Sequence, residues 1–319
     1  MRQPIKPAAL RPGDAVRVVS LASPVDQESL DRGCAELKRL GYVPKVDRDV
    51  VLASDSYFAG IASQRTAALR QALTEPNTKA IFCSRGGYGS NYLLDELGRN
   101  FEAPQPKILL GYSDITSLQV FLWQKLGWVT LYGPMVASGF DRGADGYDQN
   151  SFCAAVGQRG GGWVADLQGE TIVAGEAEGI LLGGCLTLLE TTLGTAWEID
   201  TTGAILLLED RGMRPYQVDR ALMHLKQAGK LRDVRGIVLG EFPECNAQDG
   251  GESVRHIAMR IFLPLEHRPC RPVVFGTRIG HTTRPMLTLP LGIRARLSAS
   301  ASSSGNSGTQ LELLEPAVV

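Results

Sequence analysis

ILLGYSDITSLQ, residues 108–119, is the stretch that decides the fold. An apolar run typical of a buried strand leads into the turn GYSD at positions 111–114, and a helical pattern continues through residue 124. A strand that meets a helix across so short a turn is typical of a βα unit in a parallel sheet. The polar residues of the turn would then lie at the carboxyl end of that sheet, where open α/β sheets bind ligands.

The same alternation of strand and helix extends upstream from this stretch. Strand-like runs occupy residues 14–20, 42–47 and 80–84, and helical patterns occupy residues 26–40, 63–73 and 91–97. This order predicts an α/β fold with a mainly parallel, doubly wound sheet in a first domain, residues 1–140.

Downstream, residues 141–175 are rich in turn-forming residues and are interpreted as a linker. Residues 176–319 then show strand-like runs at 175–184, 204–210, 235–241 and 273–280, with a strong helical pattern at 216–227 that ends at Gly229. The pattern predicts a second, mixed α/β domain. Its serine-rich segment, 298–308, is expected to be a turn between two final strands, the last of them an edge strand at 310–316.

Composition argues against several classes of partner. The chain of 319 residues has a net charge of -1, with 44% apolar and 21% charged residues. Nucleic acid and anionic membranes need a clustered basic surface, so neither is expected, and a small-molecule or peptide substrate fits better. We find no apolar stretch of signal-peptide or membrane-spanning length, which predicts a cytoplasmic protein.

Cysteine and histidine spacing gives no sign of a disulfide framework or of a metal site. The six cysteines contain no CxxC pair and are expected to be reduced thiols: Cys34, Cys83, Cys153, Cys185, Cys245 and Cys270. The four histidines show no metal-ligand spacing, so we expect neither a metal nor another cofactor. Three of them are interpreted as structural: His224, His256 and His267.

Ser113 is the first candidate for catalysis, because a serine on a tight turn after a parallel strand has a strained backbone and an exposed hydroxyl. The helix N-terminus behind it would supply N–H groups and a positive dipole end for a developing oxyanion. However, Ser113 or Asp114 could equally be a plain helix cap, and the turn lacks the second glycine of G-x-S-x-G.

A second glycine-rich loop, SRGGYGS at 84–90, also follows a strand and precedes a helix. Phosphate binding is poorly supported, since the third glycine of G-x-G-x-x-G would fall on Tyr92. Alternatively, Gly86 and Gly87 let the backbone approach a reacting carbonyl and lend it an N–H, or they form an ordinary tight turn.

Glu209 and His281 each follow an apolar strand directly, so both side chains would lie at carboxyl ends of strands. A lone histidine after a strand is usually an ordinary loop residue. Nevertheless, a carboxylate that fixes one ring nitrogen while the other faces a serine hydroxyl is the arrangement of an activated nucleophile.

Together these motifs identify a resemblance. RGGYG (85–89), GYSDIT (111–116), LLLEDRGMRPYQVDRAL (206–222) and GHTTRPMLTLPLG (280–292) resemble the LD-carboxypeptidases, serine peptidases that include the microcin C immunity proteins. The resemblance covers nearly the whole chain. It implies an N-terminal Rossmann-like, flavodoxin-like domain, a mixed C-terminal domain and an active site in the cleft between them.

The resemblance also implies roles for individual residues. Ser113 would be the nucleophile, His281 the general base and Glu209 the residue that orients it, with oxyanion donors at the backbone of Asp114 and of Gly86 or Gly87. The implied reaction is hydrolysis of an L,D-amide bond in murein tetrapeptides, which releases D-alanine during cytoplasmic cell-wall recycling, by a homodimer. Four arginines are candidates to bind the substrate carboxylate: Arg85, Arg211, Arg214 and Arg284.

One residue departs from the family pattern. Cys185 stands where the family usually has the asparagine of GGNL, which removes an amide that could contact substrate. Two alternatives therefore stay open beside the peptidase: an immunity-type amidase that acts on peptidyl-nucleotide antibiotics, and a non-catalytic module that binds muropeptides.

Overall fold

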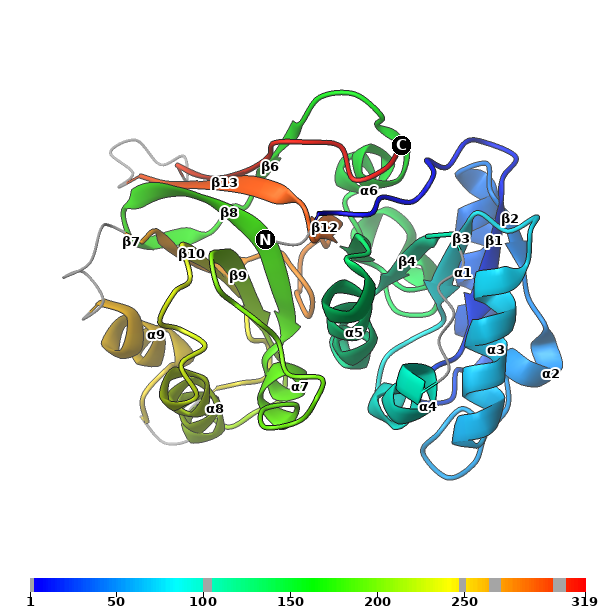
Figure 1. Ribbon diagram of the computed structural model, residues 1–319, viewed down its shortest axis with the longest axis horizontal. Coiled ribbons are helices and arrows are strands. Elements are labelled where there is room, and N and C mark those ends of the chain that lie inside the picture. The colour runs from blue at the N-terminus through cyan, green and yellow to red at the C-terminus, as the bar shows by residue number, and fades with distance from the viewer. Residues whose placement is uncertain (1–2, 100–104, 247–250, 264–270, 301–307) are drawn as a thin grey trace. The chain divides into compact units, whose positions relative to one another are not determined.

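The computed structural model describes residues 3–99, 105–246, 251–263, 271–300 and 308–319 (Figure 1). The chain divides into two compact units, each built around one sheet. The first unit comprises Met1–Arg159, Arg284–Leu291 and Ala317–Val319, and the second comprises Gly160–Thr283 and Gly292–Pro316.

The first unit contains a six-stranded sheet with the order β12-β5-β4-β3-β1-β2. Its strands are β1 (Ala15–Val19), β2 (Val43–Lys45), β3 (Ala80–Cys83), β4 (Ile108–Gly111), β5 (Thr130–Tyr132) and β12 (Leu289–Leu291). The first five pair in parallel in the order 2-1-3-4-5, which is the flavodoxin-like order. The expected parallel, doubly wound sheet is therefore confirmed.

Helices in two groups accompany this sheet (Figure 1). Helix α1 packs against η3, whereas α3 and α5 contact η1. The elements are α1 (Gln27–Arg39), α2 (Arg48–Val51), α3 (Ala62–Thr74), η1 (Ser90–Leu93), α4 (Leu94–Arg99), η2 (Ser113–Ile115), α5 (Thr116–Leu126), η3 (Phe140–Asp145) and α6 (Gln149–Gly157). Helix α1 begins where the Asp26 side chain accepts a hydrogen bond from the backbone N–H of Ser29, an ordinary N-cap.

The second unit contains an eight-stranded sheet with the order β6-β14-β13-β8-β9-β10-β11-β7. Strands β8 to β11 are parallel to one another, and the remaining strands join the two edges in antiparallel pairs. The strands are β6 (Trp163–Asp166), β7 (Glu170–Val173), β8 (Gly175–Cys185), β9 (Ala204–Glu209), β10 (Gly236–Gly240), β11 (Val273–Thr277), β13 (Arg294–Ala299) and β14 (Thr309–Leu313). The expected mixed domain is confirmed.

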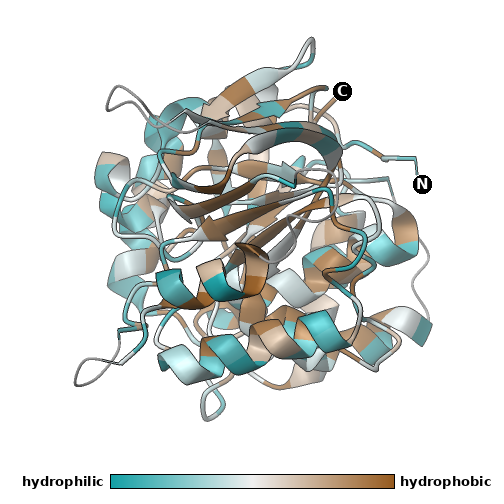
Figure 2. Cartoon of the chain, turned by 90° about the vertical axis from the view of Figure 1, so that its left-hand side faces the viewer, coloured by the Kyte–Doolittle hydropathy of each residue, from teal (hydrophilic) through white to brown (hydrophobic). Residues whose placement is uncertain are grey.

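The centre of the second sheet is strongly apolar. All residues of β9 and β10 are buried, and Figure 2 shows the central strands in brown beside helices with teal outer faces. The helices are α7 (Leu186–Thr191), α8 (Pro215–Gln227) and α9 (Val254–Phe262), and α8 packs against both of the others. Burial on both faces explains why these parallel strands read as continuous apolar runs.

The bounds of the units differ from the expected domains in two places. Residues 141–175, expected as a linker, contain α6, β6 and β7, because their few apolar side chains, such as Phe152 and Ala165, are buried. Residues 284–291, expected in the second domain, belong to the first unit, because β12 pairs with β5. Strand β14 pairs with both β13 and β6 and is not an edge strand.

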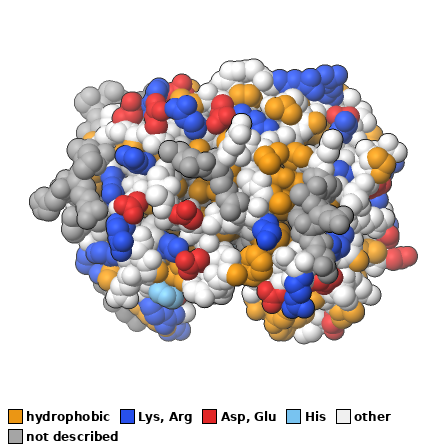
Figure 3. Space-filling model, in the orientation of Figure 1, with side chains coloured by type: hydrophobic (Ala, Val, Ile, Leu, Met, Phe, Trp, Pro, Cys, Tyr) orange, Lys and Arg blue, Asp and Glu red, His pale blue; other side chains and the backbone are white. Residues whose placement is uncertain are grey.

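The surface carries both signs of charge. Figure 3 shows acidic and basic side chains interspersed over the visible face. In the described part of the chain, no helix combines the length and apolar character needed to cross a membrane. Five cysteines are free thiols there: Cys34, Cys83, Cys153, Cys185 and Cys245. Cys270, His267 and residues 301–307 of the serine-rich segment lie outside the described residues.

Candidate active site

Ser113 lies on a strained turn directly after β4. Its φ is 61°, in the left-handed region that residues with a side chain rarely adopt, and its backbone N–H donates to the Tyr132 hydroxyl at 3.3 Å. Neither η2 nor α5 has a side-chain cap, so neither Ser113 nor Asp114 is a helix cap. This removes the structural explanation that the sequence left open for the turn.

Asp114 has a different task, because its side chain is wholly buried and faces the glycine-rich loop. Its carboxylate accepts hydrogen bonds from the backbone N–H groups of Gly89 at 3.2 Å and Ser90 at 2.7 Å. The Ser90 hydroxyl donates to the Asp114 carbonyl at 2.5 Å. Burial raises the pKa of Asp114, although these hydrogen bonds oppose the rise. Asp114 therefore fastens the loop that follows β3 to the turn that follows β4.

Gly86 lies against the candidate nucleophile. A methyl group placed on Gly86 would be 3.0 Å from Cβ and 3.2 Å from Oγ of Ser113, and 3.5 Å from the backbone nitrogen of Asp114. Gly87 adopts a φ of 112° and lies close to Ser23. The loop backbone can approach the serine this closely only because these positions lack side chains.

Glu209 and His281 form a pair in the second unit, although they are 72 residues apart in the chain. The Glu209 carboxylate, fully buried, accepts from Nδ1 of His281 at 2.7 Å and from the His281 backbone N–H at 2.8 Å. Gly280 makes the second bond possible: it has a φ of 59°, and a Cβ there would lie 2.2 Å from the Glu209 carboxyl carbon. The ring of His281 is thus fixed in orientation by one buried carboxylate.

The electrostatics of this pair favour the protonated ring. Burial by itself lowers the pKa of His281, but the charge of Glu209 and its hydrogen bond outweigh burial and raise that pKa above 6.5. Asp210 adds to the rise, and Arg211 opposes it. A base of this kind takes a proton from a hydroxyl and stabilises the resulting imidazolium, which is the task of a triad histidine.

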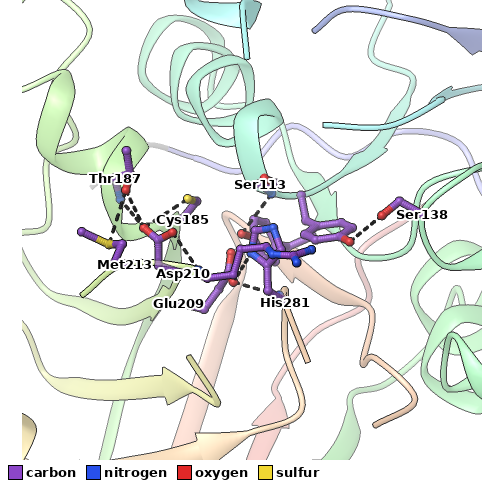
Figure 4. A network of polar contacts seen from close by, with 11 residues as sticks. Ser113, Ser138, Cys185, Thr187, Glu209, Asp210, Met213 and His281 are labelled. Atoms are coloured by element: carbon purple, nitrogen blue, oxygen red, sulfur yellow. Dashed lines mark hydrogen bonds and ion pairs between the residues drawn. The ribbon is translucent and has the colours of Figure 1, made fainter. Parts of the chain in front are cut away.

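Asp210 follows Glu209 in the chain, and its carboxylate points away from His281, toward Thr187 and Cys185 (Figure 4). It accepts from the backbone N–H of Thr187 at 2.8 Å, from the Thr187 hydroxyl at 2.7 Å and from the Cys185 thiol at 3.5 Å. Burial, and then the charge of Glu209, raise the pKa of Asp210, and burial raises that of Cys185 well above its usual value. Cys185 is therefore a buried, neutral thiol at the end of β8.

The four candidate arginines are divided between the units. Arg85 is exposed and donates to the Pro24 carbonyl at 3.2 Å, and Arg284 is half-buried in the first unit. Arg211 pairs with Glu244 at 2.5 Å, and Arg214 precedes α8 and lines a cavity of about 310 Å³.

The histidines interpreted as structural include two in described regions. His224 contacts Glu190 through Nδ1 at 3.0 Å on an exposed surface, and His256 lies in the first turn of α9. In the described ranges, no three His, Cys, Asp or Glu side chains gather in a way that could hold a metal ion.

Sequence reasoning missed three residues that lie beside the candidate catalytic residues within each unit. Tyr132 contacts the backbone of Ser113, Gly280 gives room to Glu209, and Asp210 braces the strand ends beside it. Two of these were detectable, because Gly280 directly precedes His281 and Asp210 directly follows Glu209. Tyr132 gave no signal, since its role depends on the pairing of β4 with β5.

Comparison with known proteins agrees with these observations. The family model of the LD-carboxypeptidase N-terminal domain matches residues 16–133, and that of the LD-carboxypeptidase C-terminal domain matches residues 178–297. A probable murein peptide carboxypeptidase of Bacillus subtilis strain 168 is 34% identical over 305 residues, which cover 94% of this chain and 93% of the relative.

Solved structures show the same fold. A muramoyltetrapeptide carboxypeptidase from Oxalobacter formigenes superposes with a TM-score of 0.74 and 29% identity, covering 95% of this chain and 99% of that one. An MccF-like protein from Bacillus anthracis strain Ames gives a TM-score of 0.80 and 26% identity, covering 97% and 99%. With both domain families matched in order and a relative aligned along nearly its full length, this chain belongs to the LD-carboxypeptidase family.

Proposed function

We propose that this protein is a serine carboxypeptidase in which Ser113, His281 and Glu209 form a catalytic triad. The observation that carries the proposal is the pairing of His281 with a fully buried Glu209 at 2.7 Å. This pairing engages Nδ1, so proton transfer falls to Nε2. The proposal requires the two units to present Ser113 to that nitrogen.

The reaction would follow the acyl-enzyme route. His281 takes the proton of the Ser113 hydroxyl as Oγ attacks the scissile carbonyl, and then gives it to the leaving amine. Water next attacks the ester with His281 again as the base, which releases the shortened peptide and restores the serine. The negative charge of Glu209 stabilises the imidazolium at both steps.

The tetrahedral intermediate needs donors for its oxyanion, and we propose the backbone N–H groups of Asp114 and of Gly86 or Gly87. Gly86 lies against Ser113, and the carboxylate of Asp114 holds the following part of the same loop through Gly89 and Ser90. Donors fixed before the reaction need no reorganisation as the charge develops.

For the substrate, we propose a murein tetrapeptide whose terminal D-alanine is released from an L-configured centre. Support comes from the family and from the names of the relatives in Bacillus subtilis and Oxalobacter formigenes. The terminal carboxylate would pair with one of the four candidate arginines, which are Arg85, Arg211, Arg214 and Arg284. We further propose that the enzyme acts in the cytoplasm as a homodimer, in cell-wall recycling, as the family resemblance suggests.

A mass-spectrometric digest of a murein tetrapeptide tests this proposal. Wild-type protein should release D-alanine, and Ser113→Ala should lower turnover by about 10⁴ to 10⁶-fold if the triad acts as a unit. Ser117→Ala is a matched control, because the Ser117 hydroxyl lies buried in α5 without a hydrogen-bond partner among the described residues. Full activity in Ser113→Ala, or equal losses in both variants, would reject the assignment.

The second candidate, an amidase that acts on peptidyl-nucleotide conjugates, is favoured by the similarity to the MccF-like protein over 97% of this chain. The same digest with a peptidyl-nucleotide conjugate separates the two activities. Release of the nucleotide part without release of D-alanine from the tetrapeptide would favour the amidase. Binding of the tetrapeptide without any cleavage would favour the non-catalytic module.

A further inference from the structure

Three tyrosines form an exposed aromatic surface in the first unit, which we call the tyrosine platform (Tyr57, Tyr88 and Tyr92). The ring centroid of Tyr88 lies 6.0 Å from that of Tyr57 and 5.9 Å from that of Tyr92. Their exposed fractions are 56%, 42% and 53% for Tyr57, Tyr88 and Tyr92. Large rings left open to solvent in one contiguous group typically mark a binding surface.

The neighbouring residue Phe58 supplies the packing contacts that hold this part of the first unit together. This ring is half-buried, and the guanidinium carbon of the buried Arg65 lies 4.9 Å from its centroid. A Cβ on Gly89 would be 2.6 Å from Phe58, so the phenylalanine packs directly on the loop. The tyrosine rings contact this anchor, yet about half of each tyrosine stays exposed, so packing on Phe58 does not use all of their aromatic surface.

The platform is rigidly connected to the turn that carries Ser113. Tyr88 and Tyr92 flank Gly89 and Ser90, whose backbone N–H groups are held by the Asp114 carboxylate. Arg65 donates to the Gly89 carbonyl at 2.7 Å. A surface fixed in this way binds a ligand without first having to become ordered.

We propose that the tyrosine platform binds a sugar ring, the N-acetylated hexosamine that murein carries at the amino end of its peptide. This inference rests on the proposed function. The C–H face of a pyranose stacks on an aromatic ring, while phenol hydroxyls bond to sugar hydroxyls and to an acetamido group. Rings with a polar tip suit such a ligand better than the aliphatic side chains of a protein interface do.

The distances along the chain fit this ligand. Gly86 lies against Ser113, and Tyr88, two residues further on, has its Cα within about 7 Å of that of Gly86. The ring centroids of Tyr57 and Tyr92 lie 6.0 Å and 5.9 Å from that of Tyr88. A murein tetrapeptide has three residues before its scissile bond, which extend over roughly 10 Å. A peptide bound with its reacting carbonyl at Ser113 can therefore bring its sugar to the platform.

Steady-state kinetics on two substrates test the inference: the free tetrapeptide and the same tetrapeptide carrying its disaccharide. The variant Tyr57→Ala/Tyr92→Ala should lower kcat/KM for the glycan-bearing substrate by roughly tenfold, through KM, because two stacking contacts are lost. Its kcat/KM for the free tetrapeptide should stay within about twofold of wild type, since the proposal places both rings on the sugar and not on the peptide.

Two controls separate the platform from general effects of truncation. Tyr57→Phe/Tyr92→Phe keeps both rings and should retain most of the affinity for the glycan-bearing substrate. Val164→Ala truncates a similarly exposed apolar residue on β6 of the other unit, and it should leave kcat/KM for both substrates unchanged. The oligomeric state of each variant is measured alongside by light scattering.

The outcomes are distinguishable from failure of the proposed function. Equal losses on both substrates, with or without a change of oligomeric state, or a selective loss on a peptidyl-nucleotide conjugate, would overturn the sugar assignment. If wild type cleaves neither peptide, the proposed function fails. In that case, binding of a sugar to the platform is tested separately. Wild type and Tyr57→Ala/Tyr92→Ala are titrated with N,N′-diacetylchitobiose, and binding is monitored by NMR. Binding that the variant loses supports the platform, and no binding to wild type refutes it.

Discussion

Replacing Gly280 by alanine should disable the Glu209–His281 pair without replacing either of these two residues. The new Cβ would lie 2.2 Å from the carboxyl carbon of Glu209 and 2.6 Å from its Oε2. Because carbons in contact are normally about 3.5 Å apart, the carboxyl group has to retreat by roughly 1.3 Å. A displacement of about 1 Å in a catalytic group can cost about 100-fold in rate, and we expect a loss of at least that size in kcat.

The same substitution also costs stability, and a matched control measures that part. The φ of 59° at Gly280 adds about 1–2 kcal/mol of strain for any residue with a Cβ. Gly276 has a φ of 72°, but a Cβ added there would meet no described atom within 4 Å, so Gly276→Ala carries the strain without the clash. Gly276→Ala should therefore keep most of its activity, while its free energy of unfolding falls by about the 1–2 kcal/mol that the backbone strain costs.

D-alanine release by both variants is measured at a temperature where denaturant titration shows them folded, together with the pKa of His281 by NMR. Displacement of Glu209 moves its charge away from the ring and weakens the hydrogen bond that raises this pKa, so Gly280→Ala should lower the pKa of His281. Activity within threefold of wild type, with the pKa of His281 unchanged, would refute the claim that catalysis depends on this pairing. Equal loss in Gly276→Ala would also refute it.

Three further predictions concern Glu209, Asp210 and Gly86. In a pH–rate profile, the acidic limb of kcat/KM should have its midpoint above pH 6.5, because His281 must be neutral to act as a base and its pKa is raised. In Glu209→Gln this limb should move to lower pH, because the charge that raises the pKa of His281 is gone. Asp210→Asn should move the limb in the same direction by a smaller amount while keeping substantial turnover, and an unmoved limb would remove Asp210 from the electrostatics of the site. Gly86→Ala should lower kcat by roughly 10- to 100-fold with little change in thermal stability, because its methyl group would lie 3.2 Å from Oγ of Ser113; unaltered kcat would show that the loop does not approach the reacting carbonyl.

Much of the fold was predictable, because buried parallel strands and amphipathic helices have clear periodicities. Strand β4 and helix α5 follow the pattern of residues 108–124, and β9 is a continuous apolar run. The strands β6 and β7 within the expected linker were missed because they are short and partly exposed. Their pairing depends on partners far away in the chain, which local periodicity does not encode.

The sequence alone identified the hydroxyl, carboxylate and imidazole that are the candidate catalytic groups. Glu209 is the last residue of β9, and Ser113 and His281 come shortly after β4 and β11. Residues at the ends of parallel strands lie at the carboxyl edge of their sheet. Only the tertiary structure decided how these groups are held. Glu209 reaches His281 because Gly280 leaves room for its carboxyl group, and Asp114 holds the glycine-rich loop through backbone N–H groups instead of capping a helix. Such contacts join residues far apart in sequence at distances of about 3 Å, and packing sets those distances while local sequence does not.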